Sequence, residues 1–359
     1  MKEYEVSCDH IEPIEGSPAA YRYRNKMEYT FGDMEIGGEM TLGMHQKKRY
    51  MSVVTVDECQ LVDEDFNRIL RATLDFCRER GYTKYHKKTH VGLMRHLIVR
   101  KGWHTHEILV NIVTSSEGDF DGEAWSGMIR DLPLDNTLVG VLHTVNDAVA
   151  DTVSCDRMDI LFGRDYYMEK IMGLDFKVSA FSFFQTNVGA VERLYTEALD
   201  LIDDFEGKDV LDLYCGAGTI TQIMALRARH ATGVEIVEEA VEAARMNAGL
   251  NGLDNCDFIA GDVLKVLQNS KEGNGPLSEK PDVIVFDPPR AGIHMKALDL
   301  IAAYGMEQLL YISCQPKTLC RDIKYLEAFG YHAVYLKPYD NFPMTRHVET
   351  VVLMSRVGE

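Results

Sequence analysis

The chain has 359 residues, 46% of them hydrophobic, and carries 38 lysines and arginines against 56 aspartates and glutamates, for a formal net charge of -18. This length predicts two or three domains with enough apolar residues to bury a large core. The negative charge disfavours indiscriminate binding to polyanions, although it is compatible with a local basic surface on an acidic body. No apolar run approaches the roughly 20 residues needed to cross a bilayer, so we expect no membrane contact.

The eight cysteines are scattered, with no CxxC pair and no repeated spacing. This distribution indicates reduced thiols and a cytoplasmic location, and it argues against a disulfide framework or a zinc ribbon. The histidines repeat no ligand spacing either, so we expect no metal site. The N-terminus is polar and acidic, which is not typical of a secretory signal or a transit peptide.

The first half of the chain predicts an α+β domain of hairpins covered by helices. After a segment without periodicity (residues 1–20), the Gly-rich alternating stretch 31–42 is typical of a hairpin. Helical spacing of apolar residues predicts a helix over 63–80. We also expect a helix over 119–132 and strands over 46–56, 93–99, 107–113 and 137–145. The strands over 93–99 and 107–113 are expected to be antiparallel neighbours.

The pattern changes near Asp175, where strands and helices begin to alternate. Such alternation predicts a parallel sheet with crossover helices. We expect helices over 188–202, 219–227, 237–250, 296–303 and from 318, and strands over 209–213, 230–234, 256–259, 282–286 and 309–312. A polar loop is expected at 269–280. The final strands, 332–336 and 348–354, are joined by a loop (338–346) too short and Pro-rich for a crossover helix, so they should be antiparallel. We therefore divide the chain into an N-terminal segment (1–20), a central α+β domain (21–175) and an α/β domain (176–359).

A glycine-rich turn follows the strand over 209–213. In the sequence DLYCGAGT (212–219), Gly216 and Gly218 allow a tight turn between strand and helix, where a nucleotide-like ligand can approach the backbone. The third glycine of the dinucleotide pattern GxGxxG is missing, because Thr221 stands there. The alternative is a turn that only packs a helix on a strand.

Acidic residues end three further strands. Glu235 follows Asp212 by 23 positions, a spacing that suits a carboxylate holding a ribose diol, and the alternative is a surface acid that begins an acidic helix. Asp262 could contact an adenine amino group or simply cap a helix. Asp287 opens the sequence DPPR, in which two prolines stiffen a loop that carries a carboxylate and the Arg290 guanidinium. That combination favours a functional role.

Two residues suit covalent chemistry. Cys314 follows an apolar strand and precedes Pro316, so it lies in a loop at the carboxyl end of a strand, where chemistry collects in open α/β sheets. A thiolate there can be a nucleophile, and the alternative is a buried structural cysteine. Glu349 opens an otherwise apolar strand. A carboxyl group in apolar surroundings has a raised pKa and can move protons.

Together these residues suit methyl transfer to an unreactive ring carbon. The glycine turn, Glu235, Asp287 and Cys314 come from four strands that end at one sheet edge, and the antiparallel return can bring Glu349 near. Position 5 of uracil becomes nucleophilic when a thiolate adds at position 6, and a base must then remove the proton at position 5. The sequence predicts Cys314 as the nucleophile and Glu349 as the base.

At these residues the chain resembles the RNA 5-methyluridine (uracil-C5) methyltransferase family, which depends on S-adenosylmethionine. The matching pieces are FSFFQTN (181–187), LDLYCGAGT, the strand end at Glu235, DPPRAG, YISCQPKTL and FPMTRHVE, with YRNKMEY and GLMRHLIVR in the first half. The resemblance implies a Rossmann-like class I methyltransferase domain with S-adenosylmethionine as cofactor. It also implies Cys314 as nucleophile, Glu349 as base, and around the cofactor Gln185, Tyr214, Glu235 and Asp287.

The chain also departs from the family. Members that act on large-subunit ribosomal RNA often carry an N-terminal oligonucleotide-binding barrel and a four-cysteine iron–sulfur cluster; neither is visible, so no cluster is expected. Position 315 is Gln where the family usually has Asn. The tail and YRNKMEY resemble ribosomal RNA members more closely, whereas the short form resembles transfer RNA members, which modify uridine 54. We therefore expect an RNA substrate, with ribosomal RNA favoured over transfer RNA.

The stretches 22–26, 47–49 and 78–101 are locally basic and could contact phosphates. Two alternatives stay open: an amino-group methyltransferase that does not need Cys314, and a non-catalytic RNA-binding module. A nicotinamide dehydrogenase is disfavoured by the missing third glycine.

Overall fold

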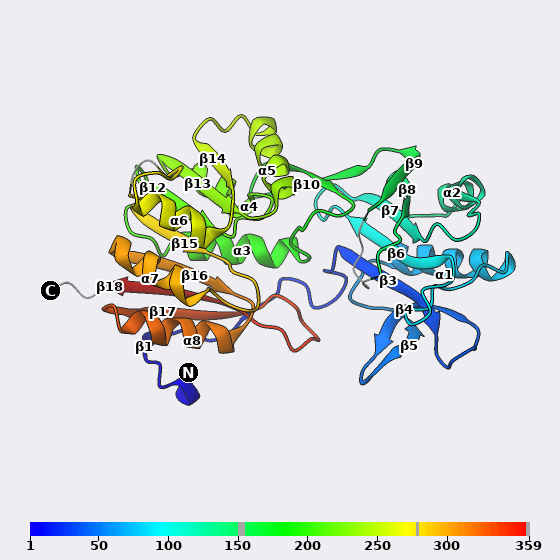
Figure 1. The fold of residues 1–359 in the computed structure, drawn as a ribbon, viewed down its shortest axis with the longest axis horizontal. Helices are drawn as coiled ribbons and strands as arrows, with labels where there is room; N and C mark the ends of the chain where they lie inside the picture. The colour runs from blue at the N-terminus through cyan, green and yellow to red at the C-terminus, as the bar shows by residue number, and fades with distance from the viewer. Residues whose placement is uncertain (150–154, 278–279, 357–359) are drawn as a thin grey trace. The chain divides into compact units, whose positions relative to one another are not determined.

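The computed structural model describes residues 1–149, 155–277 and 280–356 (Figure 1). The chain forms two units. The first, which we call the nine-stranded unit, contains Met1–Pro18, Ile171–Asp175 and Gly189–Glu359. The second, the seven-stranded unit, contains Ala19–Lys170 and Phe176–Val188. This division differs from the expected domains, because residues 1–18 belong to the nine-stranded unit and the expected boundary at 176 falls inside a strand, β11 (Leu174–Ser179).

The nine-stranded unit is built on a parallel sheet whose last strand runs in the opposite direction. Its strand order is β1-β17-β18-β16-β15-β12-β13-β14. The central strands β12 (Asp209–Leu213), β13 (His230–Glu235), β14 (Cys256–Ala260), β15 (Val283–Phe286) and β16 (Gln308–Ser313) are parallel to one another. Strand β18 (Glu349–Arg356) lies between β16 and β17 (Tyr331–Asp340), antiparallel to both. The predicted fold class, a parallel methyltransferase-type sheet with an antiparallel final strand, is therefore confirmed.

Helices connect these strands and bury the sheet, as apolar runs such as VIVF require. They are α3 (Val188–Leu199), α4 (Thr219–Ala225), α5 (Glu238–Leu250), α6 (Val263–Lys271), α7 (Met295–Tyr304) and α8 (Pro316–Glu327). Helix α6 was not predicted; part of it falls in the expected polar loop. It is short and only Val263, Val266 and Leu267 are buried in it, so its apolar face gives a weak periodic signal.

The N-terminal segment supplies partners for the far side of β17. After a short 3-10 helix (Lys2–Tyr4), strands β1 (Cys8–Ile11) and β2 (Glu15–Gly16) both pair with β17 in parallel. Strand β17 runs through Pro338 to Asp340, so the loop predicted at 338–346 starts too early. Proline is tolerated because β1 pairs with β17 only as far as Leu336, and the pairing of β2 with β17 begins at Tyr339. Pro338 therefore lies at a break between these two pairings.

The seven-stranded unit is a mixed sheet of order β4-β5-β3-β6-β7-β8-β9 (Figure 1). Its strands are β3 (Lys26–Asp33), β4 (Met40–Gln46), β5 (Arg49–Thr55), β6 (Met94–Lys101), β7 (Glu107–Thr114), β8 (Thr137–Val145) and β9 (Arg157–Gly163), with helices α1 (Glu64–Glu79) and α2 (Gly122–Arg130). The predicted hairpin is confirmed by the pairing of Phe31 with Leu42, and β6 and β7 are antiparallel as expected. Strand β9 and the hairpin of β10 (Tyr166–Ile171) and β11 were not predicted.

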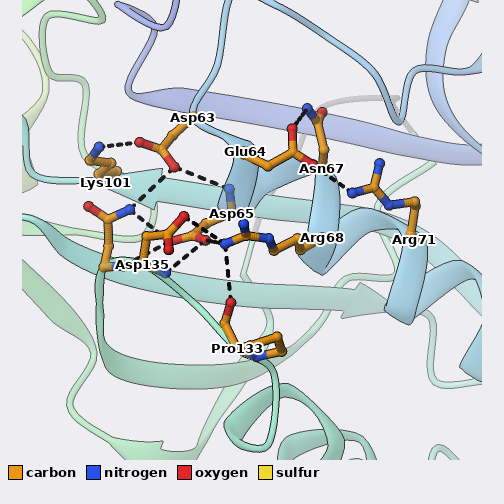
Figure 2. Close-up of polar contacts among 10 residues, drawn as sticks. Asp63, Glu64, Asp65, Asn67, Arg68, Arg71, Lys101, Pro133 and Asp135 are labelled. Atoms are coloured by element: carbon orange, nitrogen blue, oxygen red, sulfur yellow. Dashed lines mark hydrogen bonds and ion pairs between the residues drawn. The ribbon is translucent and has the colours of Figure 1, made fainter.

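A network of charged groups fixes the start of α1 (Figure 2). Asp63 caps the helix by accepting a hydrogen bond from the Asp65 backbone N–H and pairs with Lys101 at 2.6 Å. Asp65 is fully buried and pairs with Arg68 at 2.8 Å, while two backbone N–H groups of the loop before β8 also donate to it. A buried carboxylate that is satisfied in this way holds helix and loop together.

Within the described residues, no helix is both long and apolar enough to span a membrane.

Candidate active site

The glycine-rich turn after β12 depends on left-handed backbone geometry. Tyr214, Gly216 and Gly218 have φ angles of 70°, 54° and 75°. A Cβ at Gly218 would lie 2.5 Å from the Phe258 ring, so this glycine is required by packing as well as by conformation. A Cβ at Gly216 would meet no heavy atom within 4 Å, which leaves the backbone at Gly216 open to a close approach.

Thr221, at the position of the missing third glycine, has a partner of its own. Its hydroxyl donates a hydrogen bond of 2.6 Å to Asp212 Oδ2. Asp212 is fully buried, which raises its pKa to about 7, and within the described residues its Oδ1 has no hydrogen-bond partner. Sequence reasoning treated Asp212 only as the start of the motif. A buried carboxyl oxygen without a partner beside a glycine-rich turn makes it a further candidate for ligand binding.

Glu235 is held against the same turn. The Gly216 N–H donates to Glu235 Oε2 at 3.1 Å, and the N–H groups of Ile236 and Val237 donate to Oε1 at 2.8 and 3.0 Å. The predicted proximity of Glu235 and the glycine turn is therefore present. Three N–H donors fix the carboxylate, and its remaining lone pairs can accept bonds from a diol.

Asp262 caps helix α6 by accepting a hydrogen bond of 3.1 Å from the Lys265 N–H. The alternative interpretation of this residue, a helix cap, is thus what the structure shows, while its adenine contact stays a prediction. Burial raises the pKa of Tyr214 to about 12, and the negative charge of Asp262 contributes in the same direction. Tyr214 and Asp262 therefore lie near each other at the carboxyl edge of the sheet.

Cys314 occupies the loop between β16 and α8, as predicted. The thiol is partly buried, and burial raises its pKa. The negative charges of Glu349 and Asp287 raise that pKa further, whereas a hydrogen bond from the Arg290 guanidinium lowers it. Arg290 was noted in the sequence as part of DPPR but not as a site residue. The structure makes it the cation that favours the thiolate.

Glu349 reaches this loop because β18 returns beside β16. Thr350 pairs with Ser313, and the antiparallel register places the next residue back, Glu349, level with Cys314. Burial raises the pKa of Glu349 to about 8; the Asp287 charge adds to this effect and Arg290 opposes it. Burial also raises the pKa of Asp287 to about 7. Near neutral pH these acids therefore titrate as a coupled group rather than separately.

The loop that carries Asp287 and Arg290 is fixed on helix α8. The Thr318 hydroxyl lies 3.2 Å from the Arg290 carbonyl oxygen and 3.1 Å from that of Gln315, so one side chain bridges the DPPR loop and the Cys314 loop. Buried Asp322 accepts a bond of 2.9 Å from the Ile293 N–H. These bonds connect DPPR and the Cys314 loop through one helix.

Gln185, the remaining predicted site residue, belongs to the seven-stranded unit. Its backbone carbonyl oxygen accepts a hydrogen bond of 3.0 Å from the Asn25 side chain. Its role at a cofactor stays a prediction.

Among the residues that the structure describes, no group of three or more His, Cys, Asp or Glu side chains could hold a metal ion.

Comparison with known proteins identifies the family. A family model described as tRNA (Uracil-5-)-methyltransferase matches residues 153–357. The chain belongs to this family. The resemblance on which the predicted site rests is thereby confirmed, and so is the prediction of an RNA methyltransferase.

Relatives and solved structures agree with this assignment. An "Uncharacterized RNA methyltransferase" of Clostridium tetani is 48% identical over 344 residues, covering 96% of this chain and 74% of its own length. One of Clostridium acetobutylicum is 47% identical, with the same coverage of both chains. The Pyrococcus abyssi tRNA (uracil-54, C5)-methyltransferase, solved with S-adenosyl-L-homocysteine, superposes with a TM-score of 0.76 and 25% identity over 96% of this chain and 78% of that one.

The Arg290 contact predicts the reactivity of Cys314 without RNA. In Arg290→Ala, loss of the hydrogen bond should raise the pKa of the thiol, so alkylation of Cys314 by iodoacetamide at neutral pH should slow about 3- to 10-fold. Peptide-resolved mass spectrometry over a pH series measures this. Arg346→Ala, an exposed arginine of the β17–β18 loop, is the matched control and should react like the wild type. Equal rates in Arg290→Ala and wild type would contradict the assignment.

Burial of Glu349 predicts a pH-dependent stability. Its pKa is about 8 in the folded chain, against 4.5 for an unperturbed glutamate, so between these values the folded state binds a proton that the unfolded state releases. Stability is therefore lost as pH rises through this window. Glu349→Gln removes that loss, so the variant should gain about 4 kcal/mol relative to wild type between pH 5 and pH 8.5. Urea unfolding at both pH values measures it; a pH-independent difference would contradict the shifted pKa.

Proposed function

We propose that the chain transfers a methyl group from S-adenosylmethionine to C5 of a specific uridine in RNA, through a covalent bond between Cys314 Sγ and C6 of the uracil ring. The observation that carries this proposal is the cluster of Cys314, Arg290, Glu349 and Asp287 at the carboxyl edge of the sheet. In a family named for methylation at uracil C5, this cluster combines a nucleophile, a cation that favours its thiolate and a base.

The residues of the glycine turn suit S-adenosylmethionine. Gly216 leaves its backbone accessible, Glu235 presents a fixed carboxylate for a ribose diol, and Asp212 has a buried oxygen to accept a bond. Gly218, Tyr214, Asp262, Asp287 and Gln185 complete the proposed cofactor residues. When bound, the cofactor supplies an electrophilic methyl group on a sulfonium. The Pyrococcus abyssi protein, solved with S-adenosyl-L-homocysteine, supports this choice.

The reaction follows from the chemistry of these side chains. The Cys314 thiolate adds to C6, and the C5–C6 π electrons move to give an enolate whose C5 is nucleophilic. C5 then takes the methyl group, whose bond to the sulfonium sulfur would break and leave its electron pair on sulfur as a neutral thioether. The Glu349 carboxylate removes the proton from C5, the C5–C6 double bond forms again, and the bond between Sγ and C6 breaks to release the thiolate. Arg290 stabilises the negative charge on sulfur at the start and at the end.

The RNA target is the open part of the proposal. Ribosomal RNA is favoured by the likeness of FPMTRHVE and YRNKMEY to members that act on it. Uridine 54 of transfer RNA is the second candidate, because the Pyrococcus abyssi protein acts on that nucleotide and shares the fold over most of this chain. A thiolate nucleophile requires a reducing environment, which agrees with the expected cytoplasmic location.

Replacement of the nucleophile separates this mechanism from amino-group methylation. Cys314→Ala should reduce methyl transfer to RNA by at least about 1,000-fold, because no covalent adduct can form. Binding of S-adenosylmethionine, measured by calorimetry, should stay unchanged. The control is Cys155→Ala, which changes an exposed cysteine and should leave activity intact. Methylation that survives in Cys314→Ala would favour an amino-group methyltransferase.

Replacement of the base should trap the intermediate. In Glu349→Gln the proton at C5 cannot be removed, so the protein should accumulate as a covalent adduct with RNA on the peptide that contains Cys314. RNA substituted with 5-fluorouridine should trap the wild type in the same way, because fluorine does not leave as a proton does. Mass spectrometry detects the adduct, and sequencing of the trapped RNA distinguishes ribosomal from transfer RNA. A fully active Glu349→Gln without adduct would remove the base assignment, and RNA binding with neither adduct nor methylation would favour a non-catalytic module.

A further inference from the structure

The hairpin of β4 and β5 has an unusual turn. Gln46 pairs with Arg49, so Lys47 and Lys48 form a two-residue turn, and Lys48 has a φ of 69°. Two-residue hairpin turns strongly favour asparagine and glycine, because left-handed backbone crowds a Cβ. A lysine at position 48 is therefore a poor choice for folding alone. Such local conflicts are expected where function selects the residue.

An exposed aromatic ring follows this turn. The register of β4 and β5 shifts between His45 and Gln46, and irregularities of this kind re-aim side chains. Tyr50 is 59% exposed. Its ring is stacked on that of His45, with centroids 4.7 Å apart and 19° between planes. A large aromatic side chain is thus held in a defined orientation at the surface instead of in the core.

A second segment joins the turn. The Lys87 ammonium lies 4.6 Å from the Tyr50 ring centroid and 2.7 Å from His45 Nε2. The next residue, Lys88, is exposed. We call this set the hairpin-tip patch; it consists of His45, Lys47, Lys48, Arg49, Tyr50, Lys87 and Lys88.

The cations of this patch differ from others in the same unit. In the network of Figure 2, Lys101, Arg68 and Arg71 each pair with a carboxylate, at 2.6, 2.8 and 2.6 Å. The charge of the patch is carried by four exposed side chains, those of Lys47, Lys48, Arg49 and Lys88. None of them forms a salt bridge with a carboxylate in the described ranges 1–149, 155–277 and 280–356. On a chain of net charge -18, this is a local positive surface with an aromatic ring beside it.

We propose that the hairpin-tip patch binds a single-stranded stretch of the RNA substrate. The lysines and Arg49 contact phosphates, and Tyr50 stacks on an unpaired base. An unpaired stretch is the partner, because the bases of a duplex are stacked on one another and do not offer their faces. The inference rests on the proposed RNA methyltransferase function, and it adds an RNA contact made by residues that take no part in methyl transfer.

Binding of RNA to the full chain tests this proposal. The probe is a fluorescein-labelled, mixed-sequence single-stranded RNA of about 12 nucleotides, which fits the 4–16 nucleotides that comparable sites cover. Fluorescence anisotropy gives the Kd across a salt series. The main variant, Lys47→Asn with Lys48→Gly, removes both charges and places glycine at the left-handed position 48. Its Tm should equal or exceed that of wild type, and the slope of log Kd against log salt should fall by about 1.4, because each single-strand phosphate contact contributes about 0.7.

A second variant separates stacking from charge. Tyr50→Ala should weaken binding about 5- to 150-fold at every salt concentration, with the salt slope unchanged. Tyr50→Phe keeps the ring and should restore the affinity. The matched charge control is Lys265→Gln with Lys271→Gln, which removes two exposed lysines of α6 in the nine-stranded unit and should leave the slope as it is.

Several results would overturn the proposal: no binding by the wild type at the lowest salt, an unchanged slope in the Asn-Gly variant, or an equal loss in the α6 control. The proposal would also be overturned if the protein bound a duplex more tightly than the single strand and if Tyr50→Ala did not change that binding. Such a result would favour recognition of phosphates alone. The readout is independent of catalysis, since anisotropy reports binding of the probe and not methyl transfer. A failure of methyl transfer with patch-dependent binding would therefore remove the proposed function and leave the RNA surface standing.

Discussion

The proposed chemistry depends on one guanidinium, that of Arg290, placed among three acidic groups. Arg290 donates a hydrogen bond to the Cys314 thiol and opposes the pKa rise of Glu349, while Asp287 raises the pKa of both. Burial disfavours the charged form of all three acids and raises the pKa of each. One guanidinium cannot stabilise three negative charges at once. The negative charge can therefore move between the thiol and the carboxyl groups as protons are transferred. A cycle in which a thiolate adds, a carboxylate takes a proton and the thiolate leaves requires a site of this kind.

Placement of that guanidinium depends on the sheet. Asp287 and Arg290 follow β15, Cys314 follows β16, and Glu349 begins β18, which returns antiparallel beside β16. A parallel return would put the first residue of β18 at the opposite edge. Helix α8 then connects the two loops through Thr318. The direction of one strand therefore decides whether the proposed base and the proposed nucleophile meet.

The two units present their charges differently. In the nine-stranded unit the acidic groups beside Arg290 are partly buried and interact with one another, which shifts their pKa values. In the seven-stranded unit the hairpin-tip patch leaves its charges exposed to solvent, where they act at longer range and depend on salt. Lys48 fits the second role. Its left-handed backbone is unfavourable for a lysine, and an exposed ammonium group adds little to the stability of the fold, so binding is the gain that offsets this cost.

Sequence alone determined the elements with strong periodicity and the residues that end the strands. Alternation of apolar strands and amphipathic helices predicted the parallel sheet, and the positions of Glu235, Asp287 and Cys314 followed from it, because parallel strands end at one edge. The position of Glu349 followed from the short loop that makes the last strand antiparallel. Weak or compensated patterns were missed: α6 is short and mostly polar, and Pro338 is tolerated only because two N-terminal strands leave a break beside it. Only the tertiary structure decided that Arg290 lies beside Cys314 and that Thr221 donates a hydrogen bond to Asp212. It also decided which cations of the seven-stranded unit form salt bridges with carboxylates. Partners of this kind are set by distances between segments far apart in the chain, and no local pattern records those distances.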